Sequence, residues 1–363
     1  MKKITALALM LVMAAALLTG CGSKATIALI TPDNEASLSS FSKSAWEGIV
    51  KYAEEHSISK AYYTLENPND TASVEKTLDE AIKKDAKFIV LPGYQFSQAV
   101  YNYQAKYPDI KFVIVDNTPS GADGTQDIAQ NTVALSYNEE EAGFMAGYAA
   151  VNEGYTQLGF LGGEEVRSVI RYGYGFLQGA EYAAAQLSLP AGSIHVKYTY
   201  AGSFDASDSV TQLVSKWYES GTECVFAAAG QANASVIAAS DAMGGKVIGC
   251  DSDQSEDSIT VISSAIKCID NSVYSLLDDY YAGAFPGGQL VTMDVTNGGV
   301  ALSMDTSKFA VFTQEQYDDL FARLMSNTDN ITTNIIADTD DAGAVIDISA
   351  LKLSAVAVEQ VAI

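Results

Sequence analysis

Short apolar runs alternate with amphipathic stretches along most of this chain of 363 residues. Each apolar run is rich in branched aliphatic and aromatic residues, as in Phe88–Leu91, and such runs are typical of strands buried on both faces of a parallel sheet. The stretches between them carry apolar residues at helical spacing, as Val74, Leu78 and Ile82 do after the capping residue Asp70. The predicted strands are Thr26–Ile30, Lys60–Thr64, Phe88–Leu91, Phe112–Val115, Thr132–Ser136, Gln157–Leu161, His195–Tyr200, Cys224–Ala228 and Lys246–Cys250.

Parallel strands in this order need crossover helices between them, and right-handed crossovers make each sheet a doubly wound α/β sheet. The pattern changes past Ile259, where Thr260–Ser263 can cross back and the next helix can pack on the first part of the chain. The polar, acidic stretch Asn327–Ala342 is more typical of a surface loop than of a binding element. The predicted helices are Ser40 to about His56, the helix capped by Asp70, Gln95–Lys106, Glu139–Asn152, Tyr172–Gln186, Ser207–Glu219, Ala232–Met243, Ala265–Tyr281 and Thr313–Met325.

A long polar loop, Thr118–Gln130, separates the first four strand-helix units from a second group that begins again with strand, helix and strand. A chain of this length is also more than one hydrophobic core usually organises. We therefore predict two similar lobes, residues 25–131 plus about 263–290 for the first and residues 132–262 plus about 291–363 for the second.

Two lysines and an apolar run, Ile4–Leu18, open the chain and lead into Thr19-Gly20-Cys21. The run is too short to span a bilayer as a helix of the mature protein, so residues 1–20 are predicted to be a secretory signal peptide. The cysteine after Leu-Thr-Gly resembles a bacterial lipobox, in which that thiol receives a lipid and becomes the mature N-terminus. An ordinary cleaved signal with an incidental cysteine is the alternative. On the lipobox interpretation, Cys21 anchors the chain to the extracytoplasmic face of the cell membrane.

Removal of the signal would leave 19 basic and 45 acidic residues and a formal charge of −26. This charge, with no basic stripe to oppose it, argues against a nucleic-acid partner.

The other cysteines, Cys224, Cys250 and Cys268, show no paired spacing. Buried thiols are the preferred interpretation, and a disulfide bond between neighbouring strands is the alternative. Neither His56 nor His195 has a partner at metal-ligand spacing, so no zinc site or histidine triad is indicated.

The loops after the strands are the place to search for a binding site, because ligands of open parallel sheets bind beyond the carboxyl ends of the strands. Asp116 and Asp251 lie there, and carboxylates can accept paired hydrogen bonds from vicinal sugar hydroxyls, with a helix cap or a hinge salt bridge as the alternative for each. Phe41 and Phe204 can stack on a planar ring, although Phe41 could equally be a core residue. Gly230 lets backbone amides approach a ligand closely. No phosphate loop, dinucleotide fingerprint or nucleophile elbow is present, which favours binding without a cofactor over catalysis.

These loops also carry the motifs of one family. The most specific are Ala228-Ala229-Gly230, Ile248-Gly249-Cys250-Asp251-Ser252-Asp253-Gln254 and Ser263-Ser264-Ala265-Ile266-Lys267, in that order. On these segments the chain resembles the basic membrane protein family, the purine-nucleoside receptor lipoproteins that serve ABC importers as substrate-binding proteins. Further matching segments are Ser40-Phe41, Ala45-Trp46-Glu47-Gly48, Gly93–Phe96, Tyr107-Pro108-Asp109, Val115-Asp116, Glu140-Glu141-Ala142-Gly143, Gly159–Gly163 and Gly202-Ser203-Phe204-Asp205.

The resemblance implies a type I periplasmic-binding-protein fold, in which two Rossmann-like lobes joined by three hinge crossovers close over one ligand. It also implies ABC permease and ATPase subunits as partners, a nucleoside-like ligand and a monomeric receptor. Carried over position by position, the family's site residues are Phe41 and Phe204 around the base, Asp116 on the first lobe, and Gly230, Asp251 and Lys267 at the ribose.

Two features leave alternatives open. Lys267 could instead be a solvent-facing lysine in the first turn of a helix. The stretch Ser37–Ser42 lacks the acidic residues and the asparagine that family members carry around this Ser-Phe pair, so the ligand could be recognised differently. The alternatives to a nucleoside receptor are a sugar-binding receptor or sensor of the same fold and a secreted nucleoside hydrolase. The hydrolase would need a calcium-binding aspartate cluster, of which the first loop offers only Asp33.

Overall fold

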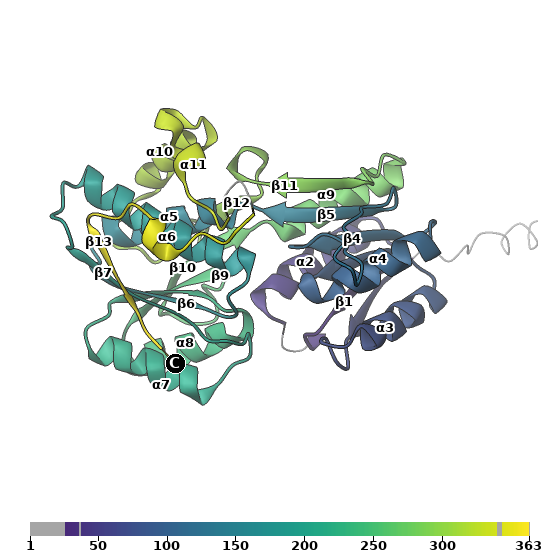
Figure 1. Ribbon diagram of the computed structural model, residues 1–363, viewed down its shortest axis with the longest axis horizontal. Coiled ribbons are helices and arrows are strands. Elements are labelled where there is room, and N and C mark those ends of the chain that lie inside the picture. Colours follow the sequence, from purple (N-terminus) through teal and green to yellow (C-terminus); the bar gives the residue numbers. More distant parts are fainter. Residues whose placement is uncertain (1–25, 36–37, 340–342, 363) are drawn as a thin grey trace, which may run out of the picture.

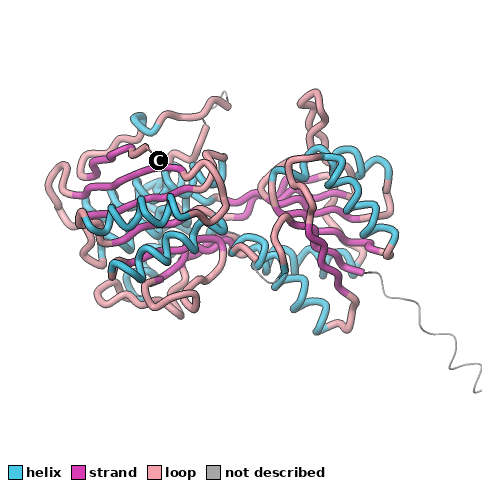
Figure 2. The backbone as a smooth tube through the Cα atoms, turned by 90° about the horizontal axis from the view of Figure 1, so that it is seen from below, coloured by secondary structure: helices cyan, strands magenta, loops and turns pink. Residues whose placement is uncertain are grey.

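The computed structural model describes residues 26–35, 38–339 and 343–362, and Figure 1 shows two lobes in which helices cover the sheets. Figure 2 shows that a narrow connection joins the lobes. The predicted signal peptide, residues 1–20, and the predicted lipidated residue Cys21 lie outside the described residues. In both lobes the central strands are fully buried, as their continuous apolar runs predict.

The first lobe contains a six-stranded sheet that is parallel throughout. Its strands are β1 (Thr26–Thr31), β2 (Lys60–Thr64), β3 (Ala86–Pro92), β4 (Lys111–Val115), β5 (Thr132–Tyr137) and β11 (Gln289–Met293). Its helices are α2 (Ser40–Glu55), α3 (Thr71–Lys83), η2 (Tyr94–Phe96), α4 (Ser97–Lys106) and α9 (Ile269–Ala282). The strand order is β11-β5-β4-β3-β1-β2, and α9 packs closely on α2. A segment from late in the chain therefore completes this lobe.

The second lobe contains a seven-stranded sheet in the order β12-β10-β9-β8-β6-β7-β13, in which only β12 is antiparallel to its neighbour. Its strands are β6 (Gln157–Gly162), β7 (Ile194–Tyr200), β8 (Cys224–Ala228), β9 (Lys246–Asp251), β10 (Val261–Lys267), β12 (Val300–Leu302) and β13 (Val356–Gln360). Its helices are α5 (Glu139–Asn152), α6 (Arg167–Gln186), α7 (Asp208–Glu219), η3 (Gly230–Ala232), α8 (Asn233–Met243), η4 (Val295–Asn297), α10 (Gln314–Met325), η5 (Thr328–Asn330), α11 (Ile331–Asn334) and η6 (Ile348–Ala350).

The hydrophobic pattern locates β1 to β9 within two residues at each end, but one helix start and the strands after β9 differ from the prediction. Residues 265–267 were expected to begin a helix and instead end β10, because β9 and β12 pair with them on both sides. Helix α6 begins at Arg167 and not near Tyr172, since no side chain caps its start to mark the boundary. Strands β11, β12 and β13 were not predicted, because each is a strand only through its pairing with β5, β10 or β7.

The chain passes between the lobes three times, after β5, after β10 and after β11. The sequence indicated lobe boundaries at residue 132 and near residues 263 and 290. The strand pairings differ from those positions, because residues 132–137 form β5 in the first sheet and residues 261–267 form β10 in the second. The three passages consequently begin at Asn138, Cys268 and Asp294.

Helices α5 and α6 approach each other backbone to backbone through glycines. A Cβ atom added to Gly143 would lie 2.2 Å from the Tyr172 carbonyl oxygen, and one added to Gly147 would lie 2.0 Å from that of Phe176. Gly179 has the same relation to Phe144, at 1.9 Å. Only residues without a side chain permit this contact. The close packing brings the first turns of α5 and α6 together beside the passage that follows β5.

The three described cysteines are free thiols, with Cys224 and Cys250 buried on adjacent strands and Cys268 half-buried. The alternative of a disulfide between the neighbouring strands is therefore wrong. Burial raises the pKa of all three thiols, that of Cys268 to about 11, so the reactive thiolate form is rare at neutral pH.

Candidate functional site

Two aspartates occupy matching positions in the two lobes. Asp116 follows β4 in the first sheet and Asp251 ends β9 in the second. Both have a left-handed backbone, with φ of 63° and 66°. Residues other than glycine seldom adopt this conformation, and it persists where the surrounding structure holds it, frequently at functional sites. The pair therefore identifies the edge where the two sheets face each other.

Lys267, the last residue of β10, connects these two lobes electrostatically. Its side chain is 1% exposed, and its ammonium group forms ion pairs with Asp116 and with Glu139, whose Oε1 is 2.8 Å from Nζ. The alternative of a solvent-facing lysine at a helix start is wrong, because the residue belongs to a strand that is paired on both sides. The hinge salt bridge considered for Asp116 is present.

Three aromatic rings surround the same ammonium group. Lys267 Nζ lies 5.0 Å from the ring centroid of Phe41, 5.4 Å from that of Tyr137 and 5.7 Å from that of Tyr172. Ring faces attract a cation, so they replace part of its lost hydration. Phe41 consequently contacts the charged cluster from the first turn of α2.

Burial dominates the titration of these groups. It raises the pKa of Asp116 to about 7, although Lys267 opposes the shift, and it raises the pKa of Asp251 for the same reason. Burial alone would lower the pKa of Lys267, but the neighbouring carboxylates outweigh it and raise that pKa above its ordinary value. The cluster therefore keeps its lysine charged, while Asp116 changes charge near neutral pH.

Two carboxylate oxygens of the cluster, Asp116 Oδ1 and Glu139 Oε2, are buried and accept no hydrogen bond from the described residues. Glu139 Oε2 faces Arg171 Nη1 at 3.5 Å, whereas Asp116 Oδ1 has no such ion contact within the described ranges. The oxygens of Asp251 are engaged, since Oδ1 accepts from the Tyr172 hydroxyl at 3.2 Å and Oδ2 from the Cys250 thiol at 3.3 Å. Buried polar atoms are nearly always paired, so the free oxygen of Asp116 is a candidate contact for a bound molecule.

Phe204 rests on glycines of the second lobe. A Cβ atom on Gly163 would lie 2.4 Å from its ring and one on Gly230 would lie 3.2 Å from it. Gly230 also has φ of 58°, so a side chain there would be strained. The amide of Ala232 donates to the Phe204 carbonyl at 2.9 Å and holds the loop. The structure thus brings Phe204 and Gly230 together in the second lobe, while Phe41 belongs to α2 of the first lobe.

A cleft of about 490 Å³ lies between the lobes next to Gly230 and is lined by residues of both. Hydrogen bonds outside the charged cluster also cross between the lobes. The side-chain amide of Gln231 donates to Asp33 Oδ1 at 2.8 Å, and the hydroxyl of Tyr94 donates to Glu164 Oε2 at 3.0 Å. The lobes are therefore in contact in this structure. The cleft lining comprises Leu38, Ser39, Ser40 and Lys43 from the first lobe and Ala206, Gly230, Gln231, Asn233, Ala234, Ile237, Ala238, Asp241, Ser252, Asp253, Gln254 and Asp257 from the second.

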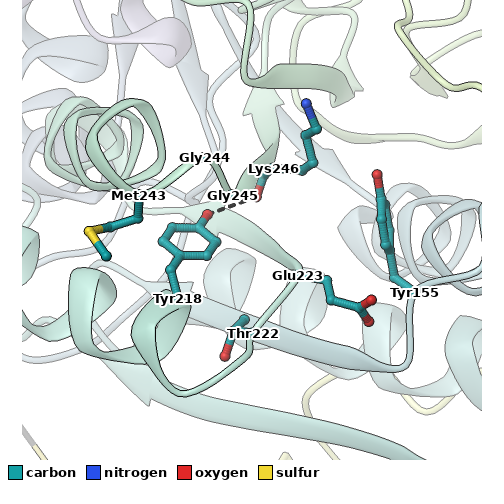
Figure 3. A pocket seen from close by; sticks show the side chains of 8 residues that line it. All are labelled: Tyr155, Tyr218, Thr222, Glu223, Met243, Gly244, Gly245 and Lys246. Carbon is teal, nitrogen blue, oxygen red and sulfur yellow. Dashed lines mark hydrogen bonds between the residues drawn. The ribbon is translucent and has the colours of Figure 1, made fainter.

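A second pocket of about 270 Å³ lies at the opposite ends of the second-lobe strands (Figure 3). Tyr155, Glu223 and Lys246 line it, and each lies at or just before the start of a strand. The Tyr218 hydroxyl donates to the Lys246 carbonyl at 2.7 Å across its wall. This pocket is far from the charged cluster, because the cluster lies at the carboxyl ends of the same strands.

Sequence reasoning missed Glu139, Tyr137 and Tyr172, which complete the cluster around Lys267. Glu139 and Tyr137 flank the first passage between the lobes, and Tyr172 projects from α6. The one available signal was the acidic triplet Glu139–Glu141 directly after an apolar strand. Tyr172 carried no signal, since its contacts depend on how α6 packs against α5.

The described residues contain neither a membrane-spanning helix nor a cluster of metal ligands. Within residues 26–35, 38–339 and 343–362, no helix combines the length and the apolar composition needed to cross a bilayer. In the same part of the chain, no group of three His, Cys, Asp or Glu side chains is arranged to hold a metal ion. The cation at the centre of the carboxylates is instead the ammonium group of Lys267.

Residues 24–346 match the family model described as ABC transporter substrate-binding protein PnrA-like. The ABC transporter nucleoside-binding protein BmpA of Lactococcus lactis subsp. cremoris is 27% identical over 300 residues, which cover 77% of this chain and 82% of that protein. The CD4+ T-cell-stimulating antigen of Listeria monocytogenes is 28% identical over 340 residues, 84% of this chain and 91% of that protein.

Solved structures agree in fold. A solute-binding protein of an ABC transporter system from Aeropyrum pernix K1 has a TM-score of 0.68 at 19% identity and covers 88% of this chain and 95% of its own. One from Conexibacter woesei has a TM-score of 0.67 at 16% identity, covering 86% and 99%. The type I periplasmic-binding-protein fold predicted from the sequence is confirmed.

Proposed function

The chain belongs to the family of PnrA-like ABC transporter substrate-binding proteins, and from this premise we propose that it captures a purine nucleoside between its lobes and delivers it to an ABC importer. The observation that carries the proposal is the buried cluster of Lys267, Asp116 and Glu139 where the lobes meet. Family members are substrate-binding proteins, so binding followed by release is the activity we assign.

The charged cluster suits the vicinal hydroxyls of a ribose. Asp116 Oδ1 can accept a hydrogen bond from one hydroxyl. The Lys267 ammonium has three N–H donors, of which Asp116 and Glu139 take two, so the third can donate to a hydroxyl oxygen. Because Asp116 comes from the first lobe and Lys267 from the second sheet, a ligand held by both favours the closed arrangement.

The aromatic residues suit a planar base. Phe41 and Phe204 lie on opposite lobes, and the ring of Phe204 lies against Gly163 and against Gly230, which lines the cleft. A base between the two rings would gain about 1–3 kcal/mol per stacking contact, estimated from base stacking on aromatic side chains in other proteins. We assign the base to these rings and the ribose to Asp116, Lys267, Asp251 and the backbone at Gly230.

The first loop should recognise the edge of the base through other groups than those of its relatives. Residues 38–42 are Leu-Ser-Ser-Phe-Ser and contribute no carboxylate. Asp33, earlier in the same loop, is already engaged, since its carboxylate accepts from Ser39 Oγ at 2.5 Å and from Gln231 at 2.8 Å. The hydroxyl of Ser40 is buried in the cleft and, among the described residues, has no partner. We propose that serine hydroxyls here contact the base where relatives use acidic groups.

We also propose where the protein is located, on the basis of Cys21. A lipid on this residue would hold the receptor on the extracytoplasmic face of the cell membrane, within reach of the permease and ATPase subunits of its importer. We further propose that it acts as a monomer, since one chain supplies both halves of the cleft. Metabolic labelling with a radioactive fatty acid tests the anchor: wild type should be labelled and Cys21→Ala should not.

A ligand screen tests the main proposal. Melting temperatures would be measured with purine and pyrimidine nucleosides, free bases and free sugars, because a ligand that binds only the folded state raises the melting temperature. Inosine or another purine nucleoside should give the largest shift. No shift with any nucleoside would reject the proposal, and a shift with sugars alone would favour the sugar receptor. Release of free base from inosine would point to the hydrolase.

Phe204→Ala separates base stacking from sugar binding. The variant should bind a nucleoside about 5- to 150-fold more weakly, as the loss of one stacking contact implies. The matched control is Phe321→Ala, which removes a half-buried aromatic ring on α10 that lies 5.6 Å from the Tyr317 ring, centroid to centroid, outside the cleft. Its nucleoside affinity should equal that of wild type. Unchanged nucleoside affinity in Phe204→Ala would eliminate the stacking role.

A further inference from the structure

The segment after α11 does not lie on the surface as an independent loop. The side-chain amide of Gln178 on α6 donates to the Ile336 carbonyl at 2.8 Å, and its oxygen accepts from the Ile336 amide at 2.9 Å. The Tyr174 hydroxyl donates to the Ile346 carbonyl at 2.6 Å. Figure 1 shows this yellow segment passing α6 on its way to β13. The sequence had indicated a surface loop over residues 327–342.

Asp338 lies in this segment and is buried, with 1% of its surface exposed. Its Oδ2 accepts from Arg167 Nε at 2.5 Å, and its Oδ1 accepts from Arg171 Nε at 2.8 Å. Both arginines lie in the first turns of α6. A buried carboxylate that binds two guanidinium groups fixes their orientation, because charge-assisted bonds of this kind are short and directional.

Arg171 continues the contact toward the ligand site. Its Nη1 donates to the Tyr137 carbonyl at 3.0 Å and lies 3.5 Å from Glu139 Oε2. The other oxygen of Glu139 pairs with Lys267 at 2.8 Å, and Lys267 pairs with Asp116. Four ion pairs therefore join the C-terminal segment to the first lobe, in the order Asp338, Arg171, Glu139, Lys267 and Asp116.

We propose that Asp338 is a positioning residue for the ligand site. By holding Arg171 through Nε, it leaves Glu139 only a long contact with Nη1, so Glu139 keeps its strong contact with Lys267. Without Asp338, the guanidinium group is free to form a two-bond pair with Glu139, which Arg and carboxylate groups favour. Glu139 would then release Lys267, whose ammonium group would lose one of the two carboxylates that fix its position at the ligand site. This inference rests on the proposed function.

The loss of Asp338 should also change the pKa of Asp116. The groups that face this chain are Lys267 on β10, Glu139 and Glu140 on α5, Arg167 and Arg171 on α6, Asp251 on β9 and the hydroxyl of Tyr172. Removal of the negative charge of Asp338, together with the pairing of Lys267 with Asp116 alone, stabilises the carboxylate form of Asp116. The pKa of Asp116 should therefore fall in the variant.

The experiment compares Asp338→Asn with wild type and with two further variants. Asp338→Glu retains the charge, and Asp347→Asn is the matched control, an exposed aspartate of the same segment whose carboxylate accepts from the Ser349 amide. Calorimetric titration with inosine at pH 8 should show at least a tenfold loss of affinity for Asp338→Asn. Asp338→Glu and Asp347→Asn should stay within threefold of wild type.

A ligand-independent measurement separates this inference from the proposed function. Carbon-13 NMR of the Asp116 carboxyl group in the free protein, assigned with Asp116→Asn, should show its midpoint at least about half a pH unit lower in Asp338→Asn. A midpoint equal to that of wild type in folded Asp338→Asn overturns the positioning role. A loss of affinity that only follows a lower melting temperature, with the midpoint unchanged, also overturns it. Absence of nucleoside binding in wild type would reject the proposed function alone.

Discussion

Lys267→Met tests whether the cluster between the lobes is held by charge. Methionine is similar in length but leaves Asp116 and Glu139 buried without their common cation. Breaking a buried ion pair by removing one partner costs about 3–5 kcal/mol. One kcal/mol corresponds to about 2–4 °C for domains of 150–250 residues. We therefore expect the melting temperature at pH 8 to fall by at least about 6 °C, with nucleoside binding lost.

The loss should depend on pH. The folded-state pKa of Asp116, about 7, is already above its ordinary value, and removal of Lys267 raises it further. A carboxyl group with a raised pKa favours the folded state at low pH, and this contribution disappears as the pH rises through the folded value. In Lys267→Met the carboxyl group of Asp116 can take up a proton at pH 5.5 and lose its unpaired charge. Part of the lost stability should therefore return at that pH.

The assay is calorimetric melting of wild type and variant at pH 5.5 and pH 8. Lys76→Met is the matched control, since Lys76 is an exposed lysine of α3 that pairs with Glu66 at 2.9 Å, and its melting temperature should equal that of wild type at both values. An equal loss for Lys267→Met at both pH values would show that packing, and not charge, is responsible. An unchanged melting temperature at pH 8 would refute the reasoning altogether.

Three further predictions concern affinity, packing and closure. Nucleoside affinity should fall by up to about tenfold per pH unit below about pH 7, because Asp116 accepts ligand hydroxyls as a carboxylate. Calorimetric titration from pH 5 to pH 8 measures this, and an affinity that does not change with pH would contradict the role of Asp116. Gly143→Ala should lose about 1–3 kcal/mol of unfolding free energy in denaturant titrations, because the new methyl group meets the Tyr172 carbonyl, and wild-type stability would contradict the close helix contact. Gln231→Leu should release ligand about two- to tenfold faster in stopped-flow measurements, since it loses its bond to Asp33 across the cleft; an unchanged rate would show that this bond does not hold the closed form.

Local chemistry made most of the fold predictable. The strands from β1 to β9 were recognisable because buried parallel strands need continuous apolar runs, and the caps at Asp70, Ser207 and Thr313 marked helix starts through their side chains. The end of β10 at Lys267 and the whole of β13 were not recognisable. Each is a strand only because a neighbouring strand supplies its hydrogen-bond partners, and those neighbours are distant in the sequence.

The candidate site divides in the same way. Asp116 and Asp251 could be found from the loops after strands, and Lys267 from the family resemblance. Glu139 and Asp338 could not, because an acidic residue at a helix start or in a polar tail is ordinarily solvated. The packing of α5 against α6 and the path of the tail bring each of them to a basic partner.

The sequence by itself therefore determined the α/β class, the two-lobed organisation and the loops that hold the site, since each follows from residues close together in the chain. Only the tertiary structure decided which carboxylates share the Lys267 ammonium and that Asp338 is joined to them through Arg171. The physical reason is that burial and pairing set the energy of a charge, and the ion pairs here join residues up to 171 positions apart.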